Sequence, residues 1–114
     1  MTMSLPTVIS DYLAAAERGD LDALVACFTD DAIVLDEDQE WRGRAGIRQW
    51  REKVANAYQY TVEVRGAANQ GSVDGVQRHD VHTHLEGNFP GGRVDLHFRF
   101  TLDHGAIARL VIEG

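Results

Sequence analysis

Apolar residues recur at helical spacing three times in the first half of the chain. The first series predicts a helix that has Ser4 as its N-cap and ends at Gly19, and Asp20 offers the N-cap of a second helix directly afterwards. A third helix is predicted to start where Gly43 and Gly46 flank the chain. The three apolar faces comprise Leu5, Val8, Ile9, Tyr12, Leu13 and Ala16, then Leu21, Leu24, Val25 and Phe28, then Ile47, Trp50 and Val54.

From Tyr58 onward the period changes to two, which indicates strands with one apolar face. We expect strands over residues 58–65, 81–86, 94–102 and 106–112, a short earlier strand over 32–36, and turns or loops over 37–40 and 71–75. The order is therefore α-α-β-α-β-β-β-β. It predicts a single α+β domain over residues 1–114, in which three helices cover a curved antiparallel sheet. A strongly curved sheet with helices at its mouth leaves a cavity, the usual place for a small ligand.

The chain is acidic, with a formal net charge of −7 and a pI near 5.0. Such a surface repels phosphates and anionic lipids, so neither nucleic acid nor a membrane is an expected partner. The first ten residues lack the basic and apolar stretches of a signal peptide, and no segment reaches the length of a membrane span. Cys27 is the single cysteine, so an intrachain disulfide is impossible, which is consistent with a cytoplasmic location.

Three segments resemble the nuclear transport factor 2 (NTF2)-like superfamily, in particular its SnoaL-like and ketosteroid-isomerase-like branches. They are DYLAAAERGDLDALVACFTDDAIVLDED (residues 11–38), WRGRAGIRQW (41–50) and HFRFTLDHGAIARLVI (97–112). The resemblance implies a conical pocket open at one end, and often a homodimer that packs the outer faces of the sheets. Many functions share this fold. No cofactor is expected, because the chain has no Gly-rich phosphate loop, no Cys-x-x-Cys and no Gly-x-Ser-x-Gly motif.

Tyr12 and Asp36 match the catalytic pair of the ketosteroid isomerases. In that family, a Tyr on the first helix donates to an enolate oxygen and an Asp after the first strand moves the proton. The resemblance thus implies Asp36 as base and Tyr12 as donor. The family's second oxyanion donor, an Asp, falls where this chain has Leu96, and Asp95 beside it should face the other way. The alternative is a core Tyr and an Asp that ends a strand.

Aromatic residues alternate onto the predicted inner side of the sheet and helices, where they form core and could also line a pocket for a flat apolar ligand. Phe89, in the Asn-Phe-Pro-Gly turn, could fringe the opening, and His79 could point inward as a polar group that orients a ligand. The alternative for His79 is a neutral core histidine. The candidate ligand-binding residues are Phe28, Trp41, Trp50, Tyr60, His79, Phe89, Phe98 and Phe100.

The opposite face of the same strands carries His82 and His84, with His97 expected across the hairpin. Asp80, Glu86 and Asp95 would share that outer face. A His-x-His pair with a third ligand is a possible zinc or iron site. The alternative is a polar face that meets solvent or a second subunit, in which case dimer strength could depend on pH.

Five basic residues cluster around the third helix. They are Arg42, Arg44, Arg48, Arg51 and Lys53. They could steer an anionic substrate to the pocket, or form a solvated face paired with nearby acids such as Glu37, Glu40 and Glu52. Three functions follow from all these features: an acid–base isomerase, cyclase or lyase acting on an apolar ring-containing molecule; a non-catalytic domain that binds a small apolar ligand; or a metal-dependent protein using His82, His84 and His97.

Overall fold

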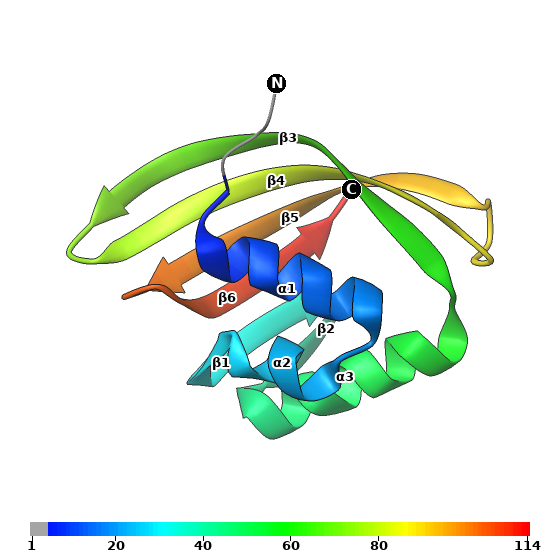
Figure 1. Ribbon diagram of the computed structural model, residues 1–114, viewed down its shortest axis with the longest axis horizontal. Coiled ribbons are helices and arrows are strands. Elements are labelled where there is room, and N and C mark those ends of the chain that lie inside the picture. The colour runs from blue at the N-terminus through cyan, green and yellow to red at the C-terminus, as the bar shows by residue number, and fades with distance from the viewer. Residues whose placement is uncertain (1–4) are drawn as a thin grey trace.

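The computed structural model describes residues 5–114, apart from the side chains of residues 55–57. Its elements are α1 (Thr7–Arg18), α2 (Leu21–Ala26), β1 (Phe28–Asp36), β2 (Gln39–Arg42), α3 (Gly43–Ala57), β3 (Tyr60–Val73), β4 (Val76–Gly87), β5 (Arg93–Asp103) and β6 (Ala106–Glu113) (Figure 1). The fold is the predicted α+β arrangement, with one strand more than expected. The stretch predicted as a turn is a tight β1–β2 hairpin, with Glu37 and Asp38 at positive φ in its turn.

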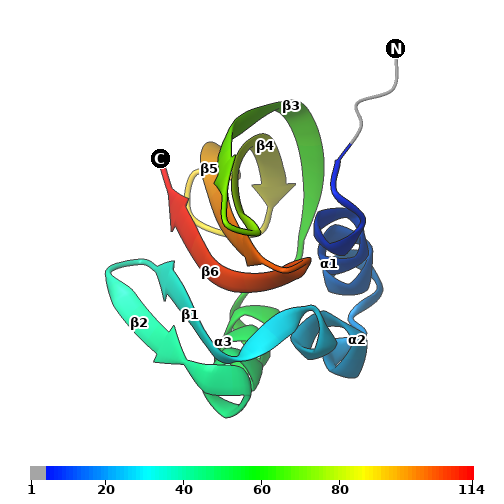
Figure 2. The same ribbon diagram turned by 90° about the vertical axis from the view of Figure 1, so that its left-hand side faces the viewer.

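All six strands form one sheet, in the order β2-β1-β6-β5-β4-β3. Neighbouring strands are antiparallel except β1 and β6, which are parallel. The prediction of an antiparallel sheet therefore holds for every pair but one. The long strands β3 to β6 curl over, with the β1–β2 hairpin and α3 below them and α1 at their side (Figure 2). The curvature creates a concave side that the helices face.

The link between α1 and α2 follows the sequence prediction closely. Gly19 ends α1 in the left-handed conformation, with φ 69°, which a glycine adopts without steric cost. Asp20 then caps α2, because its carboxylate accepts a hydrogen bond from the main-chain N–H of Ala23 at 3.1 Å. The other proposed cap, Ser4, lies outside the described residues.

The core lies between α1 and the concave side of the sheet. Strand alternation puts Val81 and Phe98, which are cross-strand partners, on this side, and puts their neighbours His82 and His97 on the outer side. Around them pack the fully buried residues Ile9, Tyr12, Phe28, Phe100, Ile107 and Leu110. In the part of the chain that is described, no helix has the length and apolar character needed to cross a membrane.

Candidate functional site

A cavity of about 720 Å³ opens between α3, the β1–β2 hairpin and the ends of β3 to β6. Its wall includes six aromatic residues: Trp41, Trp50, Tyr58, Tyr60, Phe89 and Phe98. It also includes seven charged residues: Asp36, Glu37, Asp38, Arg51, Lys53, Arg93 and Glu113. A concave site that combines apolar side chains with convergent polar groups suits a small molecule.

Asp36 is held at this wall by α3. It is the last residue of β1, and its Oδ2 accepts a hydrogen bond from Trp50 Nε1 at 3.0 Å. Trp50 is only 2% exposed, so its ring has little freedom and fixes the carboxylate in one direction. Asp36 itself is half-buried and lines the cavity. The arrangement provides an oriented carboxylate next to an apolar space, which is what a general base requires.

Arg51 supplies one of the cations of the cavity lining, which also includes Lys53 and Arg93. Its Nη1 donates to the Tyr60 hydroxyl at 3.2 Å, and its guanidinium lies 5.1 Å from the centre of the Trp50 ring. Burial alone would lower the pKa of Arg51, but the neighbouring Tyr12, Tyr60 and Asp36 outweigh it and hold the pKa above its usual value. The cavity therefore contains a permanent positive charge that could meet an oxygen carrying negative charge.

Tyr12 lies behind the lining and belongs to the core. It is 1% exposed, and its ring makes edge-to-face contacts with Phe28 at 5.8 Å and Phe100 at 5.6 Å. Burial raises the pKa of its hydroxyl strongly, while the charge of Arg51 acts in the opposite direction. Tyr12 thus stays protonated and sits near the Arg51–Tyr60 pair, but it is not among the cavity-lining residues.

The candidate ligand-binding residues separate into two groups. Trp41, Trp50, Tyr60, Phe89 and Phe98 line the cavity. Three others lie outside its lining: Phe28 and Phe100 fill the core around Tyr12, and His79 is 9% exposed and bonded to Gln77 at 3.1 Å. Burial lowers the pKa of His79, which favours its neutral form. Leu96, at the position of the second oxyanion donor, also lines the cavity.

The family of the chain follows from comparison with known domains. The profile of the SnoaL-like domain matches residues 9–110, which is nearly the whole chain. The chain belongs to the SnoaL-like family. This confirms the resemblance to the NTF2-like superfamily seen in the sequence, and with it the cone-shaped α+β fold.

Solved structures resemble this SnoaL-like domain over most of its length. A Sinorhizobium meliloti protein assigned provisionally as a polyketide cyclase is 33% identical, with a TM-score of 0.88 over 96% of this chain and 95% of that one. SalBIII, an epoxide hydrolase/cyclase-like enzyme of pyran ring formation in salinomycin, is 22% identical, with a TM-score of 0.72 over 93% and 86%. The canthaxanthin-binding orange carotenoid protein of Anabaena is 18% identical, with a TM-score of 0.84 over 99% and 37%. The last two show the fold alone.

Reasoning from the sequence of the SnoaL-like domain missed the role of Arg51, which was grouped with a basic helix face. The sequence nevertheless contains a signal that Arg51 faces inward. Arg51 is four residues after Ile47 and three before Val54, so it shares the buried side of α3 with them. The other arginines of that face pair with acids near the surface, as Arg48 does with Asp22 at 2.8 Å.

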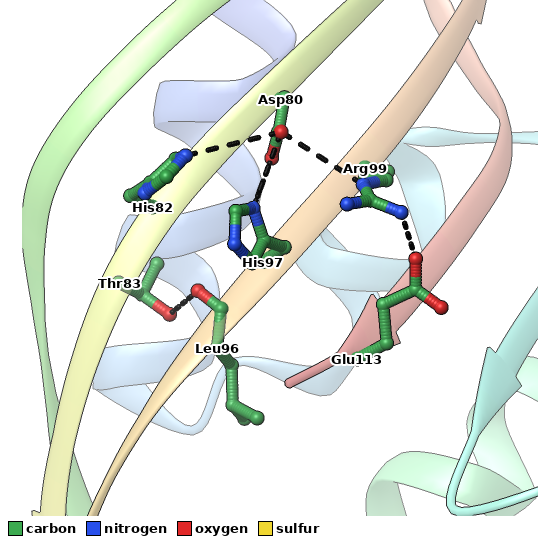
Figure 3. A network of polar contacts seen from close by, with 7 residues as sticks. All are labelled: Asp80, His82, Thr83, Leu96, His97, Arg99 and Glu113. Carbon is green, nitrogen blue, oxygen red and sulfur yellow. Dashed lines mark hydrogen bonds and ion pairs between the residues drawn. The ribbon is translucent and has the colours of Figure 1, made fainter.

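The outer face of the sheet brings together two of the three predicted metal-binding histidines. His82 and His97 are cross-strand partners, and their ring centres are 4.0 Å apart. Asp80 joins them (Figure 3). His84 instead bonds to Asp95 at 2.6 Å, an interaction that lowers the pKa of Asp95. The cluster on this face is therefore Asp80, His82 and His97 in place of the predicted three histidines.

Proposed function

We propose that this SnoaL-like domain binds a ring-containing, mostly apolar small molecule in its cavity and moves a proton on it with Asp36. One observation carries the proposal: the Asp36 carboxylate stands in an aromatic wall, oriented by the Trp50 indole at 3.0 Å. A bound apolar molecule would displace water from this carboxylate and leave its lone pairs to the substrate. The reaction class is an isomerisation, cyclisation or elimination by acid–base chemistry.

In the proposed reaction Asp36 takes a proton from a carbon next to a carbonyl group. The electron pair of that C–H bond becomes the C=C bond of an enolate, and the π pair of the carbonyl group moves onto its oxygen. The guanidinium of Arg51 and the hydroxyl of Tyr60 are groups on the same cavity wall that can stabilise this oxygen. Tyr12 lies behind these two groups and contributes to the proposal as a protonated phenol near Arg51 and Tyr60. Return of the proton from Asp36 to another atom of the substrate completes the turnover.

The relatives support a molecule on which a ring is formed. The Sinorhizobium meliloti relative is provisionally a polyketide cyclase, and SalBIII takes part in pyran ring formation. A cavity that combines aromatic side chains with carboxylates and guanidinium groups suits a molecule of that kind. We extend only the substrate class to this chain.

Binding without turnover is the second candidate. It is favoured by the position of Tyr12, since the predicted oxyanion donor does not line the cavity. A structural neighbour, the orange carotenoid protein, binds canthaxanthin, which is a long apolar ligand.

We also propose a homodimer through the outer sheet face and a cytoplasmic location. Light scattering on the purified protein tests the homodimer.

Hydrogen–deuterium exchange on a bound ketone tests the proposed base directly. Cyclic ketones, such as a tetralone and a bicyclic enone, are first screened for quenching of Trp41 and Trp50, the two tryptophans of the chain, which both line the cavity. A ketone that binds is then incubated with the protein in deuterated buffer, and NMR follows the loss of the proton next to the carbonyl group. We expect exchange well above the buffer rate.

Asp36→Asn is the informative variant, because the amide oxygen can still accept the Trp50 hydrogen bond while the base is lost. Asp74→Asn is the matched control, since Asp74 is exposed in the β3–β4 turn and lies outside the cavity lining. We expect Asp36→Asn to remove at least about 99% of the enzymatic exchange, in line with the usual contribution of a general base. If Asp36→Asn still binds the ketone and still exchanges its proton, Asp36 is not the base. If the wild type binds the ketone but shows no exchange, the protein binds a ligand without turnover.

A further inference from the structure

The outer face of the sheet, which lies opposite the cavity, carries a compact group of metal-ligand side chains. The register of β4 and β5 pairs His82 with His97 and Asp80 with Arg99. Because side chains alternate along a strand, Asp80 and His82 project from the same face, and the paired His97 and Arg99 project beside them (Figure 3). The group is therefore fixed by two long, fully paired strands and not by loops.

The distances within this group suit a small cation. One ligand atom from each of Asp80, His82 and His97 lies within 4.8 Å of the others. His97 Nδ1 is 3.0 and 3.2 Å from the two Asp80 oxygens, and His82 Nε2 is 3.9 Å from Asp80 Oδ2. In a tetrahedral site with bonds of about 2.1 Å, ligand atoms are about 3.4 Å apart. The observed separations fall on both sides of this value, so small rotations of the side chains would complete the site.

Asp80 is unusual for a residue on the outer face of a sheet, because only 6% of it is exposed. A carboxylate so far removed from water needs partners that compensate its charge. The nearest guanidinium nitrogen, Arg99 Nε, is 3.8 Å from Asp80 Oδ2, and Arg99 also forms an ion pair with Glu113. Asp80 therefore shares Arg99 with a second acid, and its other near partners are the His82 and His97 rings.

The neighbouring strand leaves the site open. Opposite His82 and Asp80 on β3 stand Gly66 and Ala68, the two smallest residue types. A side chain at Gly66 would first meet the His82 Cβ, 4.0 Å away, so the space above the histidine is clear. The His82 side chain is 54% exposed. In a single copy of the chain, an ion could thus reach the cluster from solvent and keep water as its remaining ligands, whereas in the proposed homodimer the ion would lie at the interface.

We propose that Asp80, His82 and His97 bind one divalent transition-metal ion on the outer face of the sheet. Two imidazoles and one carboxylate are a donor set that suits Zn²⁺, Co²⁺, Ni²⁺ and Cu²⁺ better than Mg²⁺ or Ca²⁺, which prefer oxygen ligands. The bound ion would tie β4 to β5 and occupy a face that the proposed cavity chemistry does not use. Arg99 weakens binding of the metal ion, because its guanidinium competes for Asp80 and its positive charge repels the ion.

Calorimetric titration of untagged, metal-free protein with ZnCl₂ tests the proposal. We expect one equivalent of Zn²⁺ to bind, and Co²⁺ in its place to give the visible d–d absorption of a tetrahedral site. His82→Asn and His97→Asn should each weaken binding at least about tenfold, the loss that follows removal of one ligand from a site of this kind. His84→Asn is the matched control, since His84 lies on the same strand and face but pairs with Asp95, and it should bind as the wild type does.

Arg99→Gln gives an expectation of the opposite sign. Removing its charge should tighten zinc binding by about tenfold, because a unit charge this close to the ion contributes at least that much even in a partly solvated place. The exposed position of His82 makes His82→Asn safe for folding, which circular dichroism verifies. Absence of zinc binding by the wild type, full binding by His82→Asn, or loss of binding in His84→Asn would each overturn the proposal.

Discussion

The hydrogen bond between Trp50 and Asp36 joins the buried side of α3 to the end of β1, and Trp50→Phe removes it. Phenylalanine keeps most of the ring in a position that is 2% exposed, but it has no N–H to donate. The variant therefore separates the orientation of Asp36 from the packing of the helix. It should lower the free energy of unfolding and loosen the carboxylate at the same time.

The expected size follows from two contributions. Losing a hydrogen bond to a charged acceptor costs about 1.5–3 kcal/mol, with the lower end applying here because the freed carboxylate can meet water in the cavity. Exchanging Trp for Phe also removes about 40 Å³ of buried volume, which at about 24 cal/mol per Å³ adds about 1 kcal/mol. We therefore expect a loss of about 2.5 kcal/mol in the free energy of unfolding.

Urea denaturation followed by far-ultraviolet circular dichroism measures this loss without depending on tryptophan fluorescence. Trp41→Phe is the control, because Trp41 is only half-buried and packs under Lys53 at the cavity rim. Combining Trp50→Phe with Asp36→Ala in a double-mutant cycle should give a coupling free energy of about 1–2 kcal/mol. A coupling below about 0.5 kcal/mol, together with equal losses for the two tryptophan variants, would refute the view that Trp50 holds Asp36.

Two further changes test the frame around the cavity. Gly87→Ala would push a Cβ into the carbonyl oxygen of Gln59, so a thermal melt should show a loss of stability of at least about 2 kcal/mol. Gly66→Ala is the control, because its Cβ would meet the nearest side chain at 4.0 Å and should cost less than about 1 kcal/mol. Asp20→Ala should lower the melting temperature at pH 7, unlike Asp22→Asn, because it removes the cap of α2. The hydrogen bond from the α2 main chain lowers the pKa of Asp20, so the cap stabilises the protein above the unfolded pKa of about 4 and loses this effect as pH falls through the folded pKa. The difference in melting temperature between the wild type and Asp20→Ala should therefore shrink in acid. A difference that grew in acid would contradict the cap.

Much of the fold could be predicted from periodicity. The α1–α2 link and the pairing of His82 with His97 follow from local spacing and strand alternation. β3 and β4, however, are longer than the predicted strands over 58–65 and 81–86, and β3 includes part of the predicted loop over 71–75. The β1–β2 hairpin and the parallel pairing of β1 with β6 could not be predicted from periodicity. The parallel pairing depends on contacts between segments far apart in the chain. The hairpin is local, but its short, polar β2 has the composition of a turn.

The site was harder to predict than the fold, because alternation gives the face of a side chain but not the depth at which packing stops. Phe98 and Phe100 share one face of β5, yet Phe98 lines the cavity and Phe100 packs on Tyr12 in the core. Arg51 belongs by sequence to a basic cluster, and its charge alone does not reveal that its position on α3 turns it toward the cavity. On the outer face, hydrogen bonding decided that Asp80 and not His84 joins the other histidines.

Ligand titration followed by ¹⁵N–¹H NMR tests most directly whether the cavity is the binding site. The chain has two tryptophans, so the spectrum contains two indole N–H signals, and both side chains line the cavity. Addition of a cyclic ketone that binds should shift both, with the Trp50 signal also reporting on its hydrogen bond to Asp36. Saturable binding that leaves both indole signals in place and shifts the amides around His82 on the outer face would contradict the proposed site.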